Sequence, residues 1–177
     1  MALKRQSGDQ HSAVQFKKGN LLEVILCALV ESGLEPRRLE LEITETSLLE
    51  NQEAHLATIR QLKNLGISLA LDDFGTGYSS VTYLTNFPFD KIKIDRSFTR
   101  DVLERRDYAA VVSSVLALAQ GLGKLTTVEG IETERQFEYM REAGVNLAQG
   151  YLFSRPVPAA ELDFTVRYLP GQQHMVA

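Results

Sequence analysis

The chain has 177 residues, of which 44% are hydrophobic and 24% are charged, and this composition is typical of one soluble globular domain with a hydrophobic core. Its formal net charge is −4, and no run of Lys or Arg is long enough to form a basic stripe, so a nucleic-acid polymer is excluded as an expected partner. No apolar stretch approaches the ~20 residues that span a bilayer. The only cysteine, Cys27, excludes a disulfide within the chain, lies in an apolar run and is expected to be a small buried hydrophobe. We therefore expect a cytoplasmic protein with no membrane segment in this chain.

The first predicted elements are a helix, a strand and a second helix. Asn20 and Glu23 have the spacing of a capping box, and they begin a helix that ends at Gly33. Strict alternation of apolar and polar residues in LELEIT, residues 39–44, predicts a strand. Apolar residues at helical spacing then predict a second helix that ends at Gly66.

The same alternation of strands and helices continues along the chain. Further strands are predicted at residues 67–72, 91–95, 125–130 and 145–150. Helices are predicted from Ser79 to Asn86, from about residue 111 to the GLG at 121–123, and from a Thr133–Gln136 capping box to Gly144. Strands that alternate with helices imply a parallel sheet with right-handed crossovers.

The residues at the strand ends distinguish an open doubly wound sheet from a (β/α)8 barrel. Each predicted strand ends on a polar or charged group, in order Glu42, Asp72 with Asp73, Lys93 with Asp95, Glu129, and Gln149. An open sheet gathers ligands at one switch point, whereas a barrel brings the carboxyl ends of all its strands to one site, so the even distribution favours a TIM-type barrel. Since a complete barrel takes about 250 residues, we expect an incomplete α/β barrel that lacks its first strands.

Two adjacent aspartates, Asp72 and Asp73, follow an apolar strand and precede a glycine-rich turn. Their like charges repel each other unless a cation lies between them, and all-oxygen ligands suit Mg²⁺, Mn²⁺ or Ca²⁺. The alternative is that Asp73 caps the turn FGTGYSS while Asp72 pairs with Lys93. Because Glu42, Glu129 and Lys93 are predicted at neighbouring strand ends, we favour the metal site.

Five segments resemble, in order, the signature segments of the EAL domain, a bacterial phosphodiesterase that hydrolyses cyclic di-GMP to the linear dinucleotide. They are LELEITET, LALDDFGTGYSS, FDKIKIDRSF, TVEGIET and QGYLFSRPVP. The resemblance covers nearly all of Ser12 to Phe164, and several segments in order are far more specific than one motif. It implies a TIM-like barrel, cyclic di-GMP as the substrate, and a site for two divalent ions, Mg²⁺ or Mn²⁺.

The resemblance also implies roles for individual residues. Glu42 resembles a metal-binding glutamate, Asp72 the aspartate that bridges both ions, and Asp73 the ligand of the second ion. Lys93 resembles the lysine that orients the attacking water and offsets charge on the phosphate. Glu129 resembles the glutamate that holds a water at the metal.

Further residues of the family pattern have supporting roles. Gln149 resembles the glutamine that supports the same centre, and Glu45 resembles the glutamate that anchors the loop after DDFG, with a capping role as its alternative. Asp95 is expected to fix the catalytic lysine or the loop beside it rather than to bind metal. Gly75 and Gly77 fit a loop that approaches a ligand closely or flexes, although any tight turn also explains them.

We expect two nearby charged residues to have structural rather than catalytic roles. Lys91 lies on the same face of its strand as Lys93 but nearer the strand's start, and we expect it to be an exposed strand lysine. Glu132 is expected to be a charge favoured by the start of a helix.

The sequence departs from the family pattern at two metal ligands. The tripeptide EAL does not occur, and Gln10 stands where members have an asparagine before AVQF. We therefore expect residues 1–11 to be a non-native or diverged start, residues 12–165 to be a partial EAL domain, and residues 166–177 to be a tail. An unclosed barrel exposes sheet edges, so a homo-oligomer or attached regulatory domains are expected to cover them.

Two classes of function stay open. The first is a metal-dependent cyclic di-GMP phosphodiesterase, which we expect to be weak or inactive as this chain alone because ligands are missing. The second is a non-catalytic EAL-like module that binds a nucleotide or a partner. An unrelated open-sheet receiver would not explain Lys93, Glu129 and Gln149 together.

Overall fold

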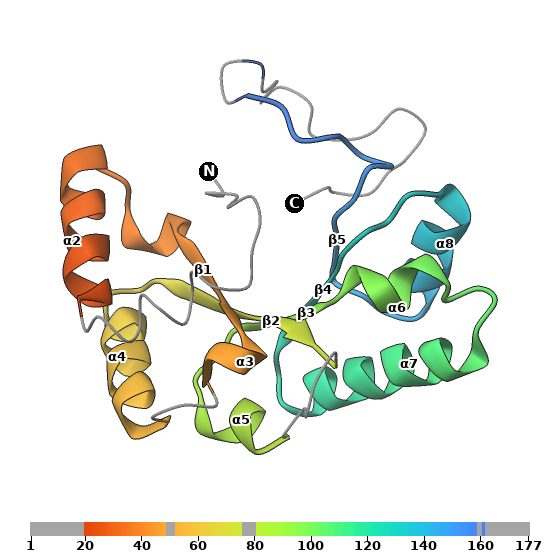
Figure 1. The fold of residues 1–177 in the computed structure, drawn as a ribbon, viewed down its shortest axis with the longest axis horizontal. Helices are drawn as coiled ribbons and strands as arrows, with labels where there is room; N and C mark the ends of the chain where they lie inside the picture. Colours follow the sequence, from red (N-terminus) through yellow and green to blue (C-terminus); the bar gives the residue numbers. More distant parts are fainter. Residues whose placement is uncertain (1–19, 49–51, 76–80, 159–160, 162–177) are drawn as a thin grey trace. The chain divides into compact units, whose positions relative to one another are not determined.

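The computed structural model describes residues 20–48, 52–75, 81–158 and 161 of the chain. It divides the chain into two compact units, residues 1–92 and 93–177. The boundary falls inside strand β3 (Lys91–Ile94), which is labelled in Figure 1. The expected terminal segments 1–11 and 166–177 lie outside the described residues.

The first unit alternates helices with parallel strands. Its elements are α2 (Leu21–Ser32), the 3-10 helix η1 (Pro36–Arg38), β1 (Glu40–Thr44), α3 (Glu45–Leu48), α4 (Gln52–Asn64), β2 (Ser68–Phe74) and α5 (Val81–Asn86), followed by the start of β3. β1 and β2 are parallel, with Thr44 opposite Asp72. The centre of β2 is fully buried at Leu69, Ala70 and Leu71, as expected for a parallel strand that is covered on both faces. This burial ends where the two aspartates begin.

Two expectations for helix α2 are wrong. Asn20 is the N-cap residue, but its side chain makes no capping hydrogen bond, because its backbone (φ −113°, ψ 13°) is not in the extended conformation that capping requires. Cys27 is exposed rather than buried. The buried face of α2 is formed by Ile25 and Leu29, and at about 100° per residue Cys27 points to the other side. The helix ends as predicted, at Gly33 in the left-handed conformation.

The second unit continues the same pattern. Its elements are the end of β3, then α6 (Arg96–Arg100), α7 (Arg106–Gly121), β4 (Leu125–Val128), α8 (Glu134–Glu142) and β5 (Leu147–Ala148). The carbonyl of Ile94 accepts the N–H of Glu129 at 3.1 Å, and β4 pairs in parallel with β5. The strand order β1-β2-β3-β4-β5 therefore follows the chain, as in consecutive units of a barrel.

The predicted capping box of helix α8 is confirmed. The Thr133 hydroxyl accepts the N–H of Gln136 at 3.3 Å, and the Gln136 side chain accepts the N–H of Thr133 at 3.0 Å. The side-chain Nε2 of Gln136 donates to the carbonyl of Arg100 at 3.1 Å, so Gln136 also connects α8 with the end of α6. Among the described helices, none is long and apolar enough to cross a membrane.

Candidate active site

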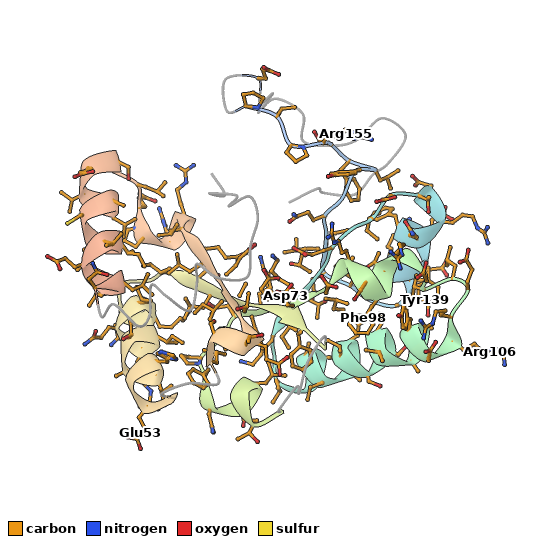
Figure 2. The ribbon with its side chains drawn as sticks, viewed as in Figure 1. Glu53, Asp73, Phe98, Arg106, Tyr139 and Arg155 are labelled. Carbon is orange, nitrogen blue, oxygen red and sulfur yellow. The ribbon has the colours of Figure 1, made fainter. Side chains whose placement is uncertain are left out.

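A pair of acidic candidate residues lies at the carboxyl end of β2, in the first unit. Asp72 and Asp73 are both half-buried, and the N–H of Asp73 donates to Oδ1 of Asp72 at 3.0 Å. Asp73 is labelled in Figure 2. Asp73 has a φ of +57°, and it alone among the described residues other than glycine has a positive φ. This conformation costs most residues about 1–2 kcal/mol, but aspartate adopts it more readily because its short side chain hydrogen-bonds locally. The turn at Asp73 gives its carboxylate a direction that regular strand alternation would not give.

Glu42 lies on the same face of the sheet as Asp72 but one step nearer the strand start. It is opposite Ala70 in the register, and two strand residues correspond to about 7 Å along the sheet. Glu45 begins α3 and is buried. The loop that we expect Glu45 to anchor includes Gly77 and lies outside the described residues, whereas Gly75 is described and has a φ of +96°, which requires glycine.

The acidic residues match a hard divalent cation in their chemistry. Carboxylate oxygens are the preferred ligands of such ions, and Asp72 and Asp73 lie next to each other at one strand end. Within the described ranges, however, no group of three His, Cys, Asp or Glu side chains is close enough together to hold a metal ion. The structure thus supplies an adjacent pair, and the contribution of Glu42 stays a prediction.

A second candidate group, in the second unit, lies at the carboxyl end of β3 and directly after β4. Lys93 Nζ is 2.7 Å from Glu129 Oε1, and the two side chains are 4% and 20% exposed. Burying two charges costs desolvation energy that their attraction offsets only in part, so such a pair is weak evidence for a role in stability. In (β/α)8 barrels the carboxyl ends of the strands carry the functional groups, so the position of this pair suits a functional role.

Lys91 differs from the expectation of an exposed strand lysine. Its side chain is largely buried, and its Nζ is 2.8 Å from Oε2 of Glu40 at the start of β1. The register places Glu40 at the amino ends of the strands, where a charge contributes to stability rather than chemistry. The prediction that Lys91 is exposed is therefore wrong, whereas Lys91 does lie at the start of its strand, as predicted.

Asp95 and Gln149 take local positions that their predicted supporting roles allow. Asp95 is the N-cap of α6, where its carboxylate accepts the N–H of Ser97 at 2.9 Å. Gln149 uses its backbone to join β5 to β4: its N–H donates to Val128 at 2.9 Å and its carbonyl accepts the N–H of Ile131 at 3.1 Å. These contacts fix the segments beside Lys93 and Glu129.

Two glycines near the site have structural roles that were not predicted. A Cβ atom at Gly130 would lie 2.5 Å from Cβ of Arg96, and a Cβ at Gly150 would lie 2.1 Å from the carbonyl oxygen of Ile131. Both glycines fall inside segments that carry the family resemblance, TVEGIET and QGYLFSRPVP. The position of these glycines in the family segments was the one sign in the sequence that they matter. The close approach of another backbone or side chain, which is the physical reason, is visible only in the structure.

Comparison with known proteins identifies the family. The EAL domain profile matches residues 10–156. The chain belongs to the EAL domain family. It is 41% identical over 151 residues to the bifunctional diguanylate cyclase/cyclic di-GMP phosphodiesterase MucR of Pseudomonas aeruginosa, a match that covers 85% of this chain and 22% of MucR. This EAL chain therefore spans about a fifth of the length of that relative.

Solved EAL structures agree with the fold. The MucR phosphodiesterase in complex with c-di-GMP superposes with a TM-score of 0.80 at 41% identity, covering 84% of this chain and 60% of that one. Klebsiella pneumoniae BlrP1, in its pH 9.0 manganese and c-di-GMP complex, has a TM-score of 0.68 at 37% identity and covers 78% and 34%. The expected resemblance and the incomplete TIM-type α/β barrel are confirmed.

BlrP1 has been solved in a calcium complex as well as in a manganese complex. The choice of Mg²⁺ or Mn²⁺ for this chain stays a prediction. EAL relatives include proteins named cyclic di-GMP phosphodiesterases, such as NbdA of Pseudomonas aeruginosa. The roles of individual residues in this EAL chain stay predictions.

Proposed function

We propose that this chain is a metal-dependent cyclic di-GMP phosphodiesterase domain that produces the linear dinucleotide pGpG. The observation that carries the proposal is the buried ion pair of Lys93 and Glu129 at the ends of β3 and β4. An ammonium group held in a site of low dielectric stabilises the negative charge that develops on a phosphate during hydrolysis. The membership of the chain in the EAL family supplies the substrate class.

The proposed roles follow the chemistry of each side chain. Asp72 and Asp73, with Glu42, would hold a divalent cation, which would supply Lewis-acid polarisation of the phosphate. Lys93 orients the attacking water and offsets the phosphate charge, and Glu129 fixes the ammonium and a water beside it. Gln149, Asp95 and Glu45 support these groups. Turnover by this chain alone is expected to be weak, because the 177 residues contain no EAL tripeptide.

A second candidate function is a regulatory EAL-like module that binds cyclic di-GMP or a partner without turnover. The observation that favours it is that no trio of metal-holding side chains occurs in the part of the chain that the structure describes. In either case we propose a cytoplasmic protein that works as a homo-oligomer or with attached regulatory domains.

The proposal is tested by Mg²⁺- or Mn²⁺-dependent conversion of cyclic di-GMP, measured by chromatography of the linear dinucleotide. Lys93→Ala should lower the rate by about two orders of magnitude or more. Lys91→Ala is the matched control, because it removes an ion-paired lysine from the same face of the same strand, and it should retain the rate. Equal losses would contradict the assignment of Lys93.

Binding measurements separate the two candidate functions. Calorimetry that detects cyclic di-GMP binding without turnover, in a chain that circular dichroism shows to be folded, would favour the regulatory module. A folded chain with neither binding nor turnover would contradict both functions.

The metal assignment has its own test. Asp72→Asn should remove Mn²⁺ binding in calorimetry, because an amide does not replace the charge of a carboxylate ligand. Asp95→Asn should keep Mn²⁺ binding, since Asp95 accepts a helix-capping hydrogen bond, which an amide oxygen also accepts. Equal losses in the two variants would contradict the ranking.

A further inference from the structure

Thr127 has a buried hydroxyl group for which the fold gives no reason. The residue is 7% exposed, and its Oγ1 has no hydrogen-bond partner among the residues that the structure describes. The neighbouring Thr126 differs, because its hydroxyl donates to Oδ1 of Asn146 at 3.0 Å. A buried hydroxyl costs free energy unless a water or a ligand satisfies it, and such groups in folded proteins are nearly always satisfied.

The strand register places this hydroxyl beside the candidate catalytic lysine. The N–H of Glu129 donates to the carbonyl of Ile94 at 3.1 Å, which in a parallel ladder puts Ile94 opposite Val128. One residue earlier on both strands, Lys93 lies opposite Thr127. Because side chains alternate along an extended chain, Thr127 of β4 and Glu129, which directly follows β4, lie on one face, and Lys93 lies on the same face of β3.

We propose that Thr127 binds an internal water that also hydrogen-bonds to the Lys93–Glu129 pair, which makes Thr127 a positioning residue for Lys93. A buried water typically makes about three hydrogen bonds to polar groups that would otherwise be unsatisfied. A threonine hydroxyl both donates and accepts, an ammonium donates and a carboxylate accepts, so the three side chains offer the water a complete set of partners. The distance of about 4.8 Å between neighbouring strands suits a bridge of one water.

The bridge has a consequence for Lys93 that the ion pair alone does not provide. Lysine has four rotatable bonds and an ammonium that acts as a point charge, so each added hydrogen bond restricts its position further. A hydrogen bond through the water holds the ammonium from the side of β4. The kinetic part of this inference rests on the proposed phosphodiesterase function, whereas the water site does not.

The water site is tested by crystal structures of the whole chain and of two variants. Density within hydrogen-bond distance of Thr127 Oγ and of Lys93 Nζ or Glu129 Oε is expected in the wild-type chain. Thr127→Val, which has the same shape without the hydroxyl, should lose that density, and Thr127→Ser should keep it. No density in the wild-type chain, or density that persists in Thr127→Val, would overturn the proposal.

The positioning role is tested by rates. Thr127→Val should lower kcat about 10- to 100-fold with little change in KM, as expected for a residue that orients a catalytic group. Thr127→Ser should restore most of kcat. Thr99→Val is the matched control, because Thr99 also has a buried hydroxyl without a described partner but lies on α6, and it should leave kcat unchanged. An unchanged kcat in Thr127→Val would overturn the positioning role, whereas a wild-type chain without turnover would contradict the proposed function and leave the crystallographic test decisive for the water.

Discussion

Replacing Gly130 with alanine should destabilise the chain by about 2–5 kcal/mol, because a conformational cost and a steric cost act at one position. Gly130 has a φ of +72°, and the left-handed conformation costs a residue with a Cβ about 1–2 kcal/mol. The new Cβ would also lie 2.5 Å from Cβ and 3.2 Å from Cα of Arg96. Overpacking of this kind typically costs about 1–3 kcal/mol. The sum is a large share of the roughly 5–15 kcal/mol that stabilises a typical domain.

Two other glycines separate the two costs. Gly123 has a φ of +63°, and a Cβ added there would have no neighbouring atom within 4 Å, so Gly123→Ala should show the conformational cost alone. Gly150 has no positive φ, but a Cβ there would lie 2.1 Å from a backbone carbonyl oxygen, so Gly150→Ala should show the steric cost alone. The assay is urea unfolding followed by circular dichroism. If Gly130→Ala were no less stable than Gly123→Ala, Arg96 would move aside with no cost in free energy, and the predicted steric cost would be refuted.

Three further predictions concern contacts away from the metal ligands. Gln136→Ala should lower the free energy of unfolding by about 1–3 kcal/mol, because two backbone N–H groups of the α8 cap and one carbonyl of α6 lose their partner; urea unfolding measures this, and a change near zero would contradict it. The hydrogen bond from Arg105 lowers the pKa of the Asp107 carboxyl, so NMR titration of Arg105→Ala should show that pKa raised toward its ordinary value. Because the pKa of Asp107 is lowered in the folded chain, the Arg105–Asp107 pair stabilises the fold at pH values above the ordinary pKa of a carboxyl group. This stabilisation is lost as the pH falls through the pKa of Asp107 in the folded chain. Lys91→Ala should cost about 1 kcal/mol through the lost contact with Glu40, and calorimetry should show unchanged Mn²⁺ binding.

The sequence predicted those elements in which apolar residues recur over several helical turns or several strand positions. The five strands and helices α7 and α8 overlap their predicted ranges, but α7 begins at Arg106, about five residues before its predicted start, and β2 extends to Phe74. The short helices α3 and α6 were missed, because the four residues from Glu45 and the five from Arg96 are too few to show a helical period. For α6 a local signal existed, since Asp95 is a good N-cap residue.

The candidate site was predictable where it depends on strand ends and unpredictable where it depends on register. Alternation within a strand assigns Asp72 and Lys93 to a face, and the carboxyl ends of parallel strands carry the functional groups of this fold. The contact of Lys91 with Glu40 joins residues 51 positions apart, and no local pattern reports such a pairing. The left-handed backbone of Asp73 was likewise invisible, because aspartate adopts it as a single residue through local hydrogen bonds, and a periodic pattern does not report a single residue.

The two lysines of β3 are similar in sequence but have partners at opposite ends of the neighbouring strands. Lys91 and Lys93 share a face of one short strand, and each forms an ion pair with a glutamate from another strand or strand end. Lys91 meets Glu40, the first residue of β1, whereas Lys93 meets Glu129, which directly follows the last residue of β4. A pair at the amino ends is remote from the loops that bind substrate, and a pair at the carboxyl ends faces them. The position of the partner along its strand, rather than the chemistry of the lysine or the presence of a salt bridge, therefore favours Lys93 as the residue that acts on the phosphate.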